Sequence, residues 1–244
     1  MTVIVVSGTG TEIGKTVTTA TVAAVALASG RSVAMLKPAQ TGVAPGEPGD
    51  AQEVRRLAGE DVTTLELARF PEPLAPDTAA RRAGMTPVRP SDVADAAAKL
   101  AREHDLVLVE GAGGLLVRFD EEGGTLADAA RLLGAPVLLV ASAGLGTLNT
   151  TALSAEALRA RGVRQLGVAI GSWPTAPDLA SRCNLADLPK SAEADLLGAI
   201  PEGAGALDGP AFRAAAGGWL SPALGGTWDA DVFMRREAPG PVGR

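Results

Sequence analysis

The feature that most constrains the fold lies at the start of the chain, where the apolar run "TVIVVS" (residues 2–7) leads into "GTGTEIGKT" (residues 8–16). A nearly continuous apolar run of this length is typical of a strand covered on both faces. A glycine-rich turn between a strand and a helix lets backbone N–H groups converge on an anion, and the helix dipole adds a favourable field. The stretch therefore predicts a strand, a phosphate-binding turn and a helix.

This turn matches the phosphate-binding loop pattern G-x-x-x-x-G-K-[ST] only if the loop is longer by one residue. Thr9 stands where the first glycine is expected, and Gly8 comes one position earlier. Gly-Lys-Thr at 14–16 nevertheless opens a helix directly after the strand, which argues against a turn that binds nothing. In this interpretation Lys15 reaches the terminal phosphates as a point charge and the Thr16 hydroxyl coordinates Mg²⁺.

The rest of the chain alternates short apolar runs with segments of helical period, a pattern typical of βαβ units. Further strands are expected at 32–37, 105–110, 136–141, 166–171 and 196–200. Helices are expected at 15–29, 50–59, 75–83, 91–103, 125–133, 147–161 and 178–188. We predict an α/β fold with a single-domain, doubly wound, mostly parallel sheet over residues 1–220. Residues 221–244 lose periodicity and gain Gly and Pro, which predicts a peripheral or disordered tail.

Composition excludes several kinds of site. Cys183 is the only cysteine, so an internal disulfide or a cysteine zinc site is excluded, and the lone His104 cannot supply a His-rich metal centre. A net charge of −6 without a basic stripe argues against nucleic acid as a partner. No signal-peptide pattern and no apolar stretch of about 20 residues is present, so we expect a soluble, cytoplasmic protein without a membrane partner.

Unusual residues gather where the predicted strands end, the edge of such a sheet that carries ligands. Glu110 precedes Gly-Ala-Gly-Gly and either holds Mg²⁺ or is a capping or surface glutamate. Lys37 ends its predicted strand and either neutralises a transferring phosphoryl group or extends its charged end into solvent. Asp50 either caps the following helix or is a second Mg²⁺ ligand. Thr41 lies in a polar turn within reach of the same ligand.

The helix expected from residue 147 begins with "GLGTLNT". Backbone donors at its N-terminus suit an anion such as the carboxylate of a small molecule, and the alternative is an ordinary helix cap.

With these loops assembled, the chain resembles the dethiobiotin synthase family, the ATP-dependent carboxylases of biotin synthesis. The resemblance rests on "GTGTEIGKT", "KPAQTG", Asp50, "VEGAGG" and "LGTLN", which follow the family's order over most of residues 1–205. The family's loop has the same spacing between Gly8 and Gly14. The resemblance implies a P-loop NTPase-like fold, a homodimer, ATP and Mg²⁺, with 7,8-diaminopelargonic acid and carbon dioxide as substrates.

The resemblance also implies a reaction and a set of roles. Carbon dioxide converts one amine to a carbamate, ATP phosphorylates it to a mixed anhydride, and the second amine closes the ureido ring as phosphate leaves beside ADP. The implied catalytic residues are Lys37, Lys15 and Thr11, and the implied metal ligands are Thr16, Asp50 and Glu110. The implied nucleotide-binding residues are Glu12, Ile13, Gly14, Lys15, Thr16, Val17, Asp50, Glu110, Gly111, Ala112, Gly113, Gly171, Ser172, Pro201, Glu202 and Gly203. The implied substrate-binding residues are Thr41 and, from the other subunit, Leu145, Gly146, Leu148 and Asn149.

One stretch departs from the family. Its members often read adenine with an asparagine after the fifth predicted strand, whereas this chain has "IGSWP" at 170–174. A backbone-and-stacking pocket formed there with "PEGAG" at 201–205 predicts relaxed nucleotide choice, with other triphosphates competing with ATP.

Two other classes are weighed against this interpretation. A partition-type P-loop ATPase switch carries a lysine early in the loop, where this chain has Gly10, and usually needs a basic face or an amphipathic tail. An enzyme that amidates a cobalt-corrin precursor normally adds a glutaminase domain with a nucleophilic cysteine. The chain is too short for that domain, and Cys183 lacks a glycine-rich elbow.

Overall fold

A seven-stranded sheet forms the centre of the protein, in a computed structural model that describes residues 2–239. The strand order is β3-β2-β4-β1-β5-β6-β7, and every neighbouring pair is parallel. The strands are β1 (Thr2–Gly8), β2 (Val33–Thr41), β3 (Thr63–Phe70), β4 (Leu106–Gly114), β5 (Val137–Ala141), β6 (Gln165–Trp173) and β7 (Leu196–Pro201). This sheet confirms the predicted doubly wound α/β class.

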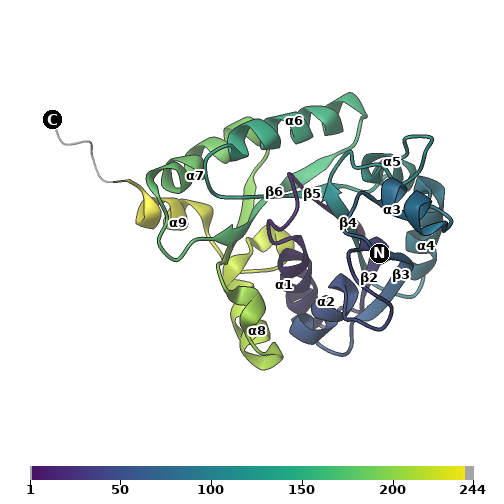
Figure 1. Ribbon diagram of the computed structural model, residues 1–244. Coiled ribbons are helices and arrows are strands. Elements are labelled where there is room, and N and C mark those ends of the chain that lie inside the picture. The colour runs from purple at the N-terminus through teal and green to yellow at the C-terminus, as the bar shows by residue number, and fades with distance from the viewer. Residues whose placement is uncertain (1, 240–244) are drawn as a thin grey trace.

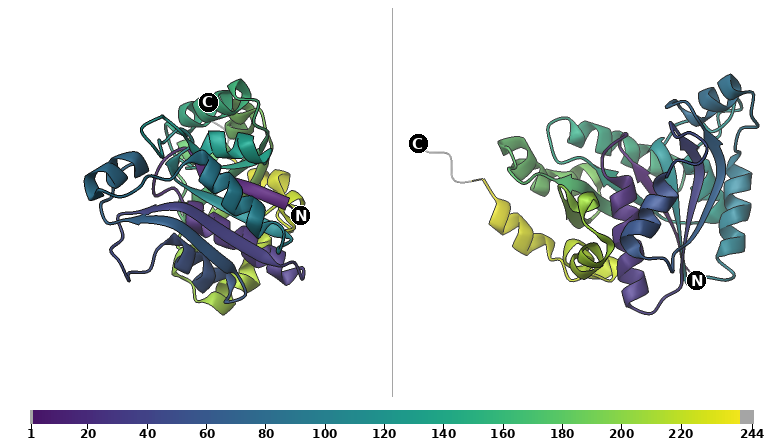
Figure 2. Two further views of the ribbon diagram at one scale, coloured as in Figure 1. Left: turned by 90° about the vertical axis from the view of Figure 1, so that its right-hand side faces the viewer. Right: turned by 60° about the horizontal axis from the view of Figure 1, so that its bottom comes forward.

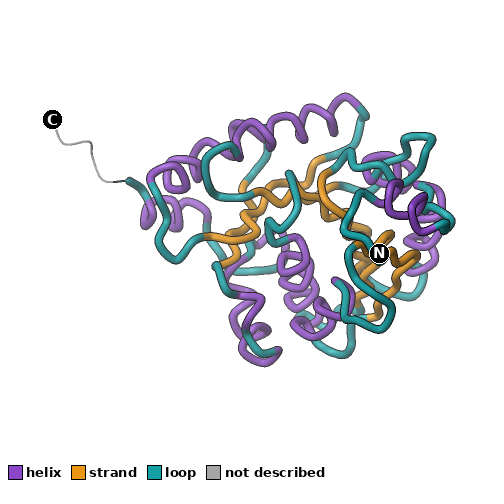
Figure 3. The backbone as a smooth tube through the Cα atoms, viewed as in Figure 1, coloured by secondary structure: helices purple, strands orange, loops and turns teal. Residues whose placement is uncertain are grey.

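Helices cover both faces of the sheet (Figure 1). One face carries α1 (Lys15–Ala28), α2 (Asp50–Ala58) and α8 (Gly209–Ala216), which pack on one another. The opposite face carries α4 (Pro90–Leu100), α5 (Leu126–Leu133), α6 (Thr147–Ala160) and α7 (Leu179–Ala192). Two further helices, α3 (Pro76–Ala83) and α9 (Ala230–Glu237), lie toward opposite ends of the sheet, and Figure 3 shows the strands enclosed between the helical layers.

The first halves of the central strands are nearly continuous apolar runs because both of their faces are buried. In β1, Ile4 packs into the core beneath α1 and α2, whereas the next residue, Val5, packs into the core beneath α4 and α5. Both side chains are at least nine-tenths buried. No polar face interrupts the run, so the sequence shows a continuous apolar stretch rather than an alternation.

The strand order determines where the loops meet. β1 lies between β4 and β5, and its register places Val6 opposite Glu110. Since all strands are parallel, their carboxyl ends share one edge of the sheet, and the loops after β1, β2 and β4 come together there.

The second strand is longer than predicted, because it pairs with a strand that the sequence pattern did not reveal. β2 continues to Thr41, so the interpretation of Lys37 as the last residue of a strand is wrong. Its partner β3 is an edge strand in which Glu66 and Arg69 interrupt the apolar pattern. The register extends the ladder beyond Lys37 to the pair Thr41 and Phe70.

For the chain beyond residue 220, which was expected to be peripheral or disordered, the structure excludes disorder at residues 222–237 and leaves the peripheral alternative. A short 3₁₀ turn at Pro222–Leu224 is followed by α9, and two further 3₁₀ turns lie at Ala204–Ala206 and Gly217–Trp219. Trp228 and Phe233 are buried against β6, β7 and α7. The segment does lie at the edge of the molecule, as the right-hand view of Figure 2 shows. Residues 240–244 fall outside the described part of the chain.

Among residues 2–239, no helix combines the length and apolar character that crossing a lipid bilayer requires.

Candidate active site

The turn after β1 is shaped to present backbone N–H groups. Glu12 and Gly14 have φ angles of 56° and 90°. Residues with positive φ turn the neighbouring amides to one side of the chain, and a non-glycine residue adopts this conformation at a cost of about 1 kcal/mol. No side chain caps the start of α1, and its first turn contains no acidic residue. The free amides and the helix dipole therefore face the same space, as an anion site requires.

This turn is supported from behind by the end of β6. A Cβ atom on Gly14 would lie 2.1 Å from the carbonyl oxygen of Gly171, and one on Gly171 would lie 2.0 Å from that of Ile13. Only glycine permits main chains to approach this closely. Gly171 thus fixes the position of the phosphate-binding turn.

Lys15 begins α1 and bends back over the turn. Its ammonium donates to the carbonyl oxygen of Gly10 at 2.7 Å, and the residue is only 8% exposed. Burial lowers the pKa of Lys15 from its ordinary value, and the nearby positive charge of Lys37 lowers that pKa further. Lys15 is therefore held where a negatively charged group bound nearby would stabilise its ammonium.

Lys37 is the centre of a buried ionic network. Its ammonium donates to Glu110 Oε1 at 3.0 Å and to the Gly111 carbonyl at 3.2 Å, and it forms an ion pair with Asp50. Lys37 is 2% exposed and Glu110 is fully buried. Burial lowers the pKa of Lys37, but the charges of Glu110 and Asp50 outweigh this effect and raise the pKa above its usual value. Lys37 is thus a permanent cation at neutral pH.

Thr16, Asp50 and Glu110 provide the oxygen atoms that Mg²⁺ prefers. The Thr16 hydroxyl donates to Glu110 Oε1 at 2.9 Å. The second carboxylate oxygen, Glu110 Oε2, is buried and has no hydrogen-bond partner. A buried carboxylate oxygen without a partner is costly, and a cation would satisfy it. The donor set therefore fits Mg²⁺, although no group of three His, Cys, Asp or Glu side chains able to hold a metal occurs in the described residues.

Asp50 does not cap its helix, which corrects one of the two interpretations of this residue. Gly49 is the N-cap of α2, and the Asp50 carboxylate points to Lys37 instead. Gln40, which the sequence reasoning missed, accepts the Asp50 backbone N–H at 2.8 Å through Oε1 and is 5% exposed. Arg69 on β3 holds the preceding loop through the Glu47 carbonyl at 2.7 Å. Side chains on β2 and β3 thus hold the main chain around Asp50 and so position its carboxylate.

The groups described above line one cavity of about 810 Å³. Predicted site residues in its wall are Thr11, Glu12, Gly14, Lys15, Thr16, Val17, Lys37, Thr41, Asp50, Glu110, Ala112 and Gly113. Its remaining wall is largely apolar and was not anticipated, because its residues are common loop types: Ala39, Val43, Pro73, Leu74, Ala75, Pro76 and Val117. Gln40 lines it as well. The cavity therefore combines a charged end with an apolar end.

The remaining predicted nucleotide residues lie outside this cavity. Ile13 and Gly111 contribute main-chain atoms next to it, while Ser172 and the group Pro201, Glu202 and Gly203 belong to the ends of β6 and β7. Trp173 is 7% exposed, and its ring packs edge-on against Phe233 with centroids 5.3 Å apart. A buried ring in that position offers no stacking face, so the stacking part of the predicted base pocket is wrong.

The predicted residues of α6 also lie apart from the cavity of their own chain. Leu145 is 93% exposed in the loop before α6, and Asn149 and Leu153, which lie four residues apart on the helix, are exposed as well. Gly146 caps α6 without a side-chain hydrogen bond. The helix therefore carries a free N-terminus beside exposed leucines.

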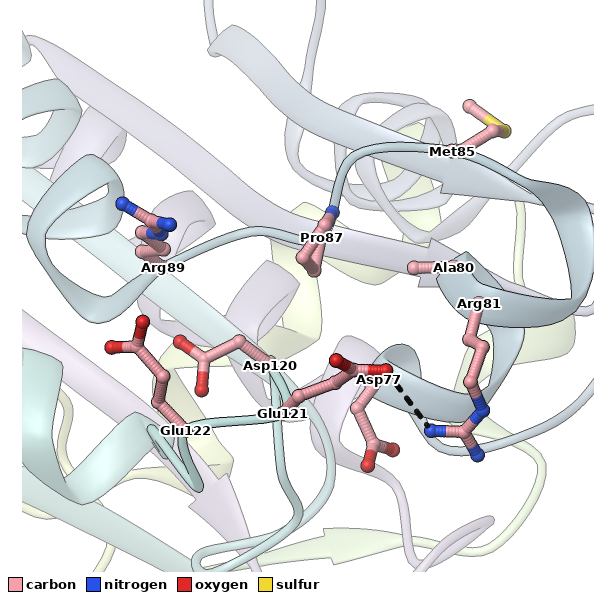
Figure 4. A pocket seen from close by; sticks show the side chains of 9 residues that line it. All are labelled: Asp77, Ala80, Arg81, Met85, Pro87, Arg89, Asp120, Glu121 and Glu122. Atoms are coloured by element: carbon pink, nitrogen blue, oxygen red, sulfur yellow. Dashed lines mark ion pairs between the residues drawn. The ribbon is translucent and has the colours of Figure 1, made fainter.

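A second cavity, of about 300 Å³, lies between α3 and the segment after β4 (Figure 4). Its wall contains acidic residues and two arginines, and Arg81 lies 3.8 Å from Glu121. It shares no lining residue with the larger cavity. We therefore assign the chemistry to the larger one.

A parallel sheet with this loop, this helix start and these buried charges defines the class of P-loop nucleoside triphosphate-binding proteins. Solved structures agree at the level of the fold. The MinC:MinD cell division complex of Aquifex aeolicus matches with a TM-score of 0.56 at 14% identity, covering 100% of this chain and 99% of that one. The MinD cell division ATPase of Pyrococcus furiosus gives 0.53 at 19% identity, covering 82% and 83%.

Sequence comparisons identify the family within this class. A family model described as an AAA domain matches residues 2–206. ATP-dependent dethiobiotin synthetase BioD of Streptomyces avermitilis is 74% identical over 98% of this chain and 100% of its own length. The Streptomyces coelicolor protein of the same name is 71% identical with the same coverage, and that of Saccharopolyspora erythraea is 68% identical over 93% and 99%. This chain belongs to the ATP-dependent dethiobiotin synthetase family.

The buried network predicts a large effect of replacing Glu110 by Gln. The variant leaves the Lys37 ammonium buried with one carboxylate partner fewer, which is expected to destabilise the fold by about 3–5 kcal/mol. The pKa of Lys37 is raised on folding, so its stabilisation is complete below the ordinary value of 10.5 and is lost only as pH rises through the higher folded value. The difference should therefore be constant across neutral and mildly alkaline pH. Urea unfolding measures it as a shift in midpoint.

Glu60→Gln is the matched control. Its ion pair with Arg55, at 2.7 Å, lies on the surface with the Glu60 side chain 80% exposed, so it should change stability by less than about 1 kcal/mol. Equal effects of the two substitutions would contradict the buried ion pair.

Proposed function

We propose that this protein is an ATP-dependent dethiobiotin synthetase that closes the ureido ring of dethiobiotin from 7,8-diaminopelargonic acid and carbon dioxide. The single observation that carries the proposal is the larger cavity. It joins a phosphate-binding turn to a buried cation, Lys37, and continues into an apolar wall suited to an aliphatic chain. The identity of 74% to a synthetase over nearly the whole chain supports the same reaction.

The reaction proceeds in three steps. One amine of the substrate attacks carbon dioxide and loses a proton, which gives a carbamate. A carbamate oxygen attacks the γ-phosphorus of ATP, the bond to the β-phosphate oxygen breaks, and ADP leaves. The second amine then attacks the carbonyl carbon of the mixed anhydride and loses a proton, and phosphate departs with the bonding electrons as the ring closes. The protein positions the reactants and neutralises charge rather than acting through an unusual acid or base.

The described residues divide this work among them. Lys15 and Lys37 offset the charge that develops between carbamate and γ-phosphate, and Thr11 orients these groups. Thr16, Asp50 and Glu110 would hold Mg²⁺, which would supply positive charge against the phosphate oxygens. Thr41 contacts the reacting end of the diamine. The free amides after Gly14 hold the phosphates, with Glu12, Ile13, Val17, Gly111, Ala112 and Gly113 around them.

The substrate site is completed by a second subunit in this proposal. The start of α6 supplies Asn149 and the half-buried Leu148, the preceding loop supplies Leu145, and the free helix start after Gly146 receives the substrate carboxylate. The exposed side chains of Leu145 and Leu153 support an interface between two copies of the chain. A homodimer acting in the cytoplasm on small substrates is the assembly we propose.

The nucleotide base lies against the ends of β6 and β7 in this proposal. The residues there offer backbone groups and few side chains, with no aromatic ring to stack on the base: Gly171, Ser172, Pro201, Glu202 and Gly203. We therefore propose weak discrimination among bases, with ATP joined by other triphosphates.

Phosphate release tests the reaction and the role of Lys37. With ATP, Mg²⁺ and bicarbonate, release should depend on added diaminopelargonate. Lys37→Gln should lower turnover about 10²–10³-fold and leave ATP affinity nearly unchanged, because the lysine stabilises charge that appears in the transition state.

Lys190→Gln, at an exposed lysine of α7, is the control and should retain full activity. Hydrolysis indifferent to the diamine would sink the synthetase proposal, and a near-normal rate in Lys37→Gln would refute the role of that lysine.

Replacing Leu153 by Asp tests the dimer. A charge on this 57% exposed side chain should separate the subunits in sedimentation velocity and raise the KM for the diamine, with ATP affinity retained. Leu132→Asp on α5, at a side chain 54% exposed, should do neither. A dimer that survives Leu153→Asp would place the interface elsewhere.

Competition assays test the nucleotide preference. CTP and GTP should inhibit the ATP reaction or be consumed in it, because the base-side loops provide few specific hydrogen bonds. Inorganic tripolyphosphate should bind more weakly than any of them. Strict use of ATP, with no inhibition by the other two, would remove this part of the proposal.

A further inference from the structure

The tail of the chain forms an aromatic cluster with the end of β6. Trp173, Trp228 and Phe233 are each less than 9% exposed. The ring of Phe233 lies 5.3 Å from each tryptophan, edge-on to Trp173 and tilted to Trp228. A chain with only three tryptophans and four phenylalanines has thus placed three of these residues at one point.

The tail half of the cluster is fixed to the body of the protein. The backbone N–H of Trp228 donates to the Leu220 carbonyl at 2.9 Å. A Cβ atom on Gly226 would lie 2.0 Å from that same oxygen, so the main chains are in direct contact. Asp229 caps α9 by accepting the Val232 N–H at 2.8 Å. α9 therefore has a defined position, beside α7 at the edge of the sheet in Figure 1.

The other half of the cluster leads to the phosphate-binding turn. The Trp173 carbonyl accepts the Glu202 N–H at 2.7 Å, and Glu202 Oε2 accepts the N–H and hydroxyl of Thr175 at 3.0 and 3.1 Å. Two residues before Trp173, Gly171 touches the main chain of the turn. The aromatic contact, the ends of β6 and β7 and the turn thus form one continuous set of contacts.

The segment from Gly171 to Thr175 is held by the contact of Gly171 with the turn, by the hydrogen bonds to Glu202 and by the burial of Trp173. The ladder between β6 and β7 is irregular between Ile170 and Trp173, and Ser172 is exposed. Trp173 is the one large side chain of the segment, and within an apolar cluster with β7 and α7 its ring packs against that of Phe233 at an interplanar angle of 73°. If that contact were lost, the segment would gain conformational freedom that a nucleotide must then remove on binding.

We propose that α9 is a brace for the base side of the nucleotide site, with Phe233 and Trp228 as positioning residues that set the affinity for the nucleoside part of the triphosphate. This inference rests on the proposed function only in placing the base at the ends of β6 and β7. The phosphate-binding turn and the buried network act on the phosphates, whereas α9 would act on the nucleoside.

Binding measurements on Phe233→Ala test the brace. The variant should bind ATP about tenfold more weakly, which corresponds to about 1.4 kcal/mol, and should bind inorganic tripolyphosphate with unchanged affinity. In turnover, the KM for ATP should rise while kcat and the KM for diaminopelargonate stay the same. Phe233→Leu, which keeps an apolar side chain against Trp173, should recover most of the ATP affinity.

Val232→Ala is the matched control, because Val232 lies on the same helix and is 53% exposed. It should leave every constant unchanged. Unchanged ATP affinity in Phe233→Ala, or an equal loss of ATP and tripolyphosphate affinity, would overturn the brace.

A fluorescence measurement keeps the proposal testable if Phe233→Ala fails to fold. Trp219 packs on Phe212, away from the cluster, so Trp219→Phe leaves Trp173 and Trp228 as the only tryptophans. ATP should change the emission of this variant and tripolyphosphate should not. Equal responses to both ligands, or none to ATP despite binding, would contradict the brace. Failure of the synthetase proposal is seen separately, as phosphate release that does not depend on the diamine.

Discussion

The ammonium group of Lys37 lies in the interior of the protein, almost without contact with water, and everything at the carboxyl edge of the sheet is arranged around it. A buried charge of this kind persists only if opposite charges accompany it. Glu110 reaches it from β4 and Asp50 from the start of α2, so the cation links a strand and a helix that are distant in sequence. Oxygen atoms of the same carboxylates face the start of α1, the helix that begins at Lys15. Stability and chemistry here share one set of side chains.

The phosphate-binding turn depends on a second constraint, which involves no side chain. Gly14 and Gly171 bring two main chains closer than any Cβ atom would allow. The turn that receives the phosphates therefore rests on the strand that leads to the base side of the site. A change at either end of this contact is transmitted through backbone atoms, which are far less adaptable than a flexible side chain.

Much of this arrangement could be predicted from the sequence because its signals are local. The continuous apolar runs revealed the buried strands, and the Gly-Lys-Thr opening of a helix revealed the anion site. The edge strand β3 was not predicted because Glu66 and Arg69 disrupt its apolar pattern. The length of β2, which pairs with β3, was therefore underestimated. The role of Gln40 was not predicted because its partner is a main-chain amide ten positions later, and no pattern of residue types indicates such a contact. The orientation of Trp173 depended on Phe233, sixty residues further along, and required the folded tail.

The position of β1 has a consequence for the order of events during synthesis. This first strand is flanked by β4 and β5, so neither of its ladders can close until residues beyond 105 and 136 have left the ribosome. Contacts between segments so far apart in sequence form slowly and leave apolar strands uncovered in the meantime. The loop at its end is therefore translated well before the strands on which its shape depends.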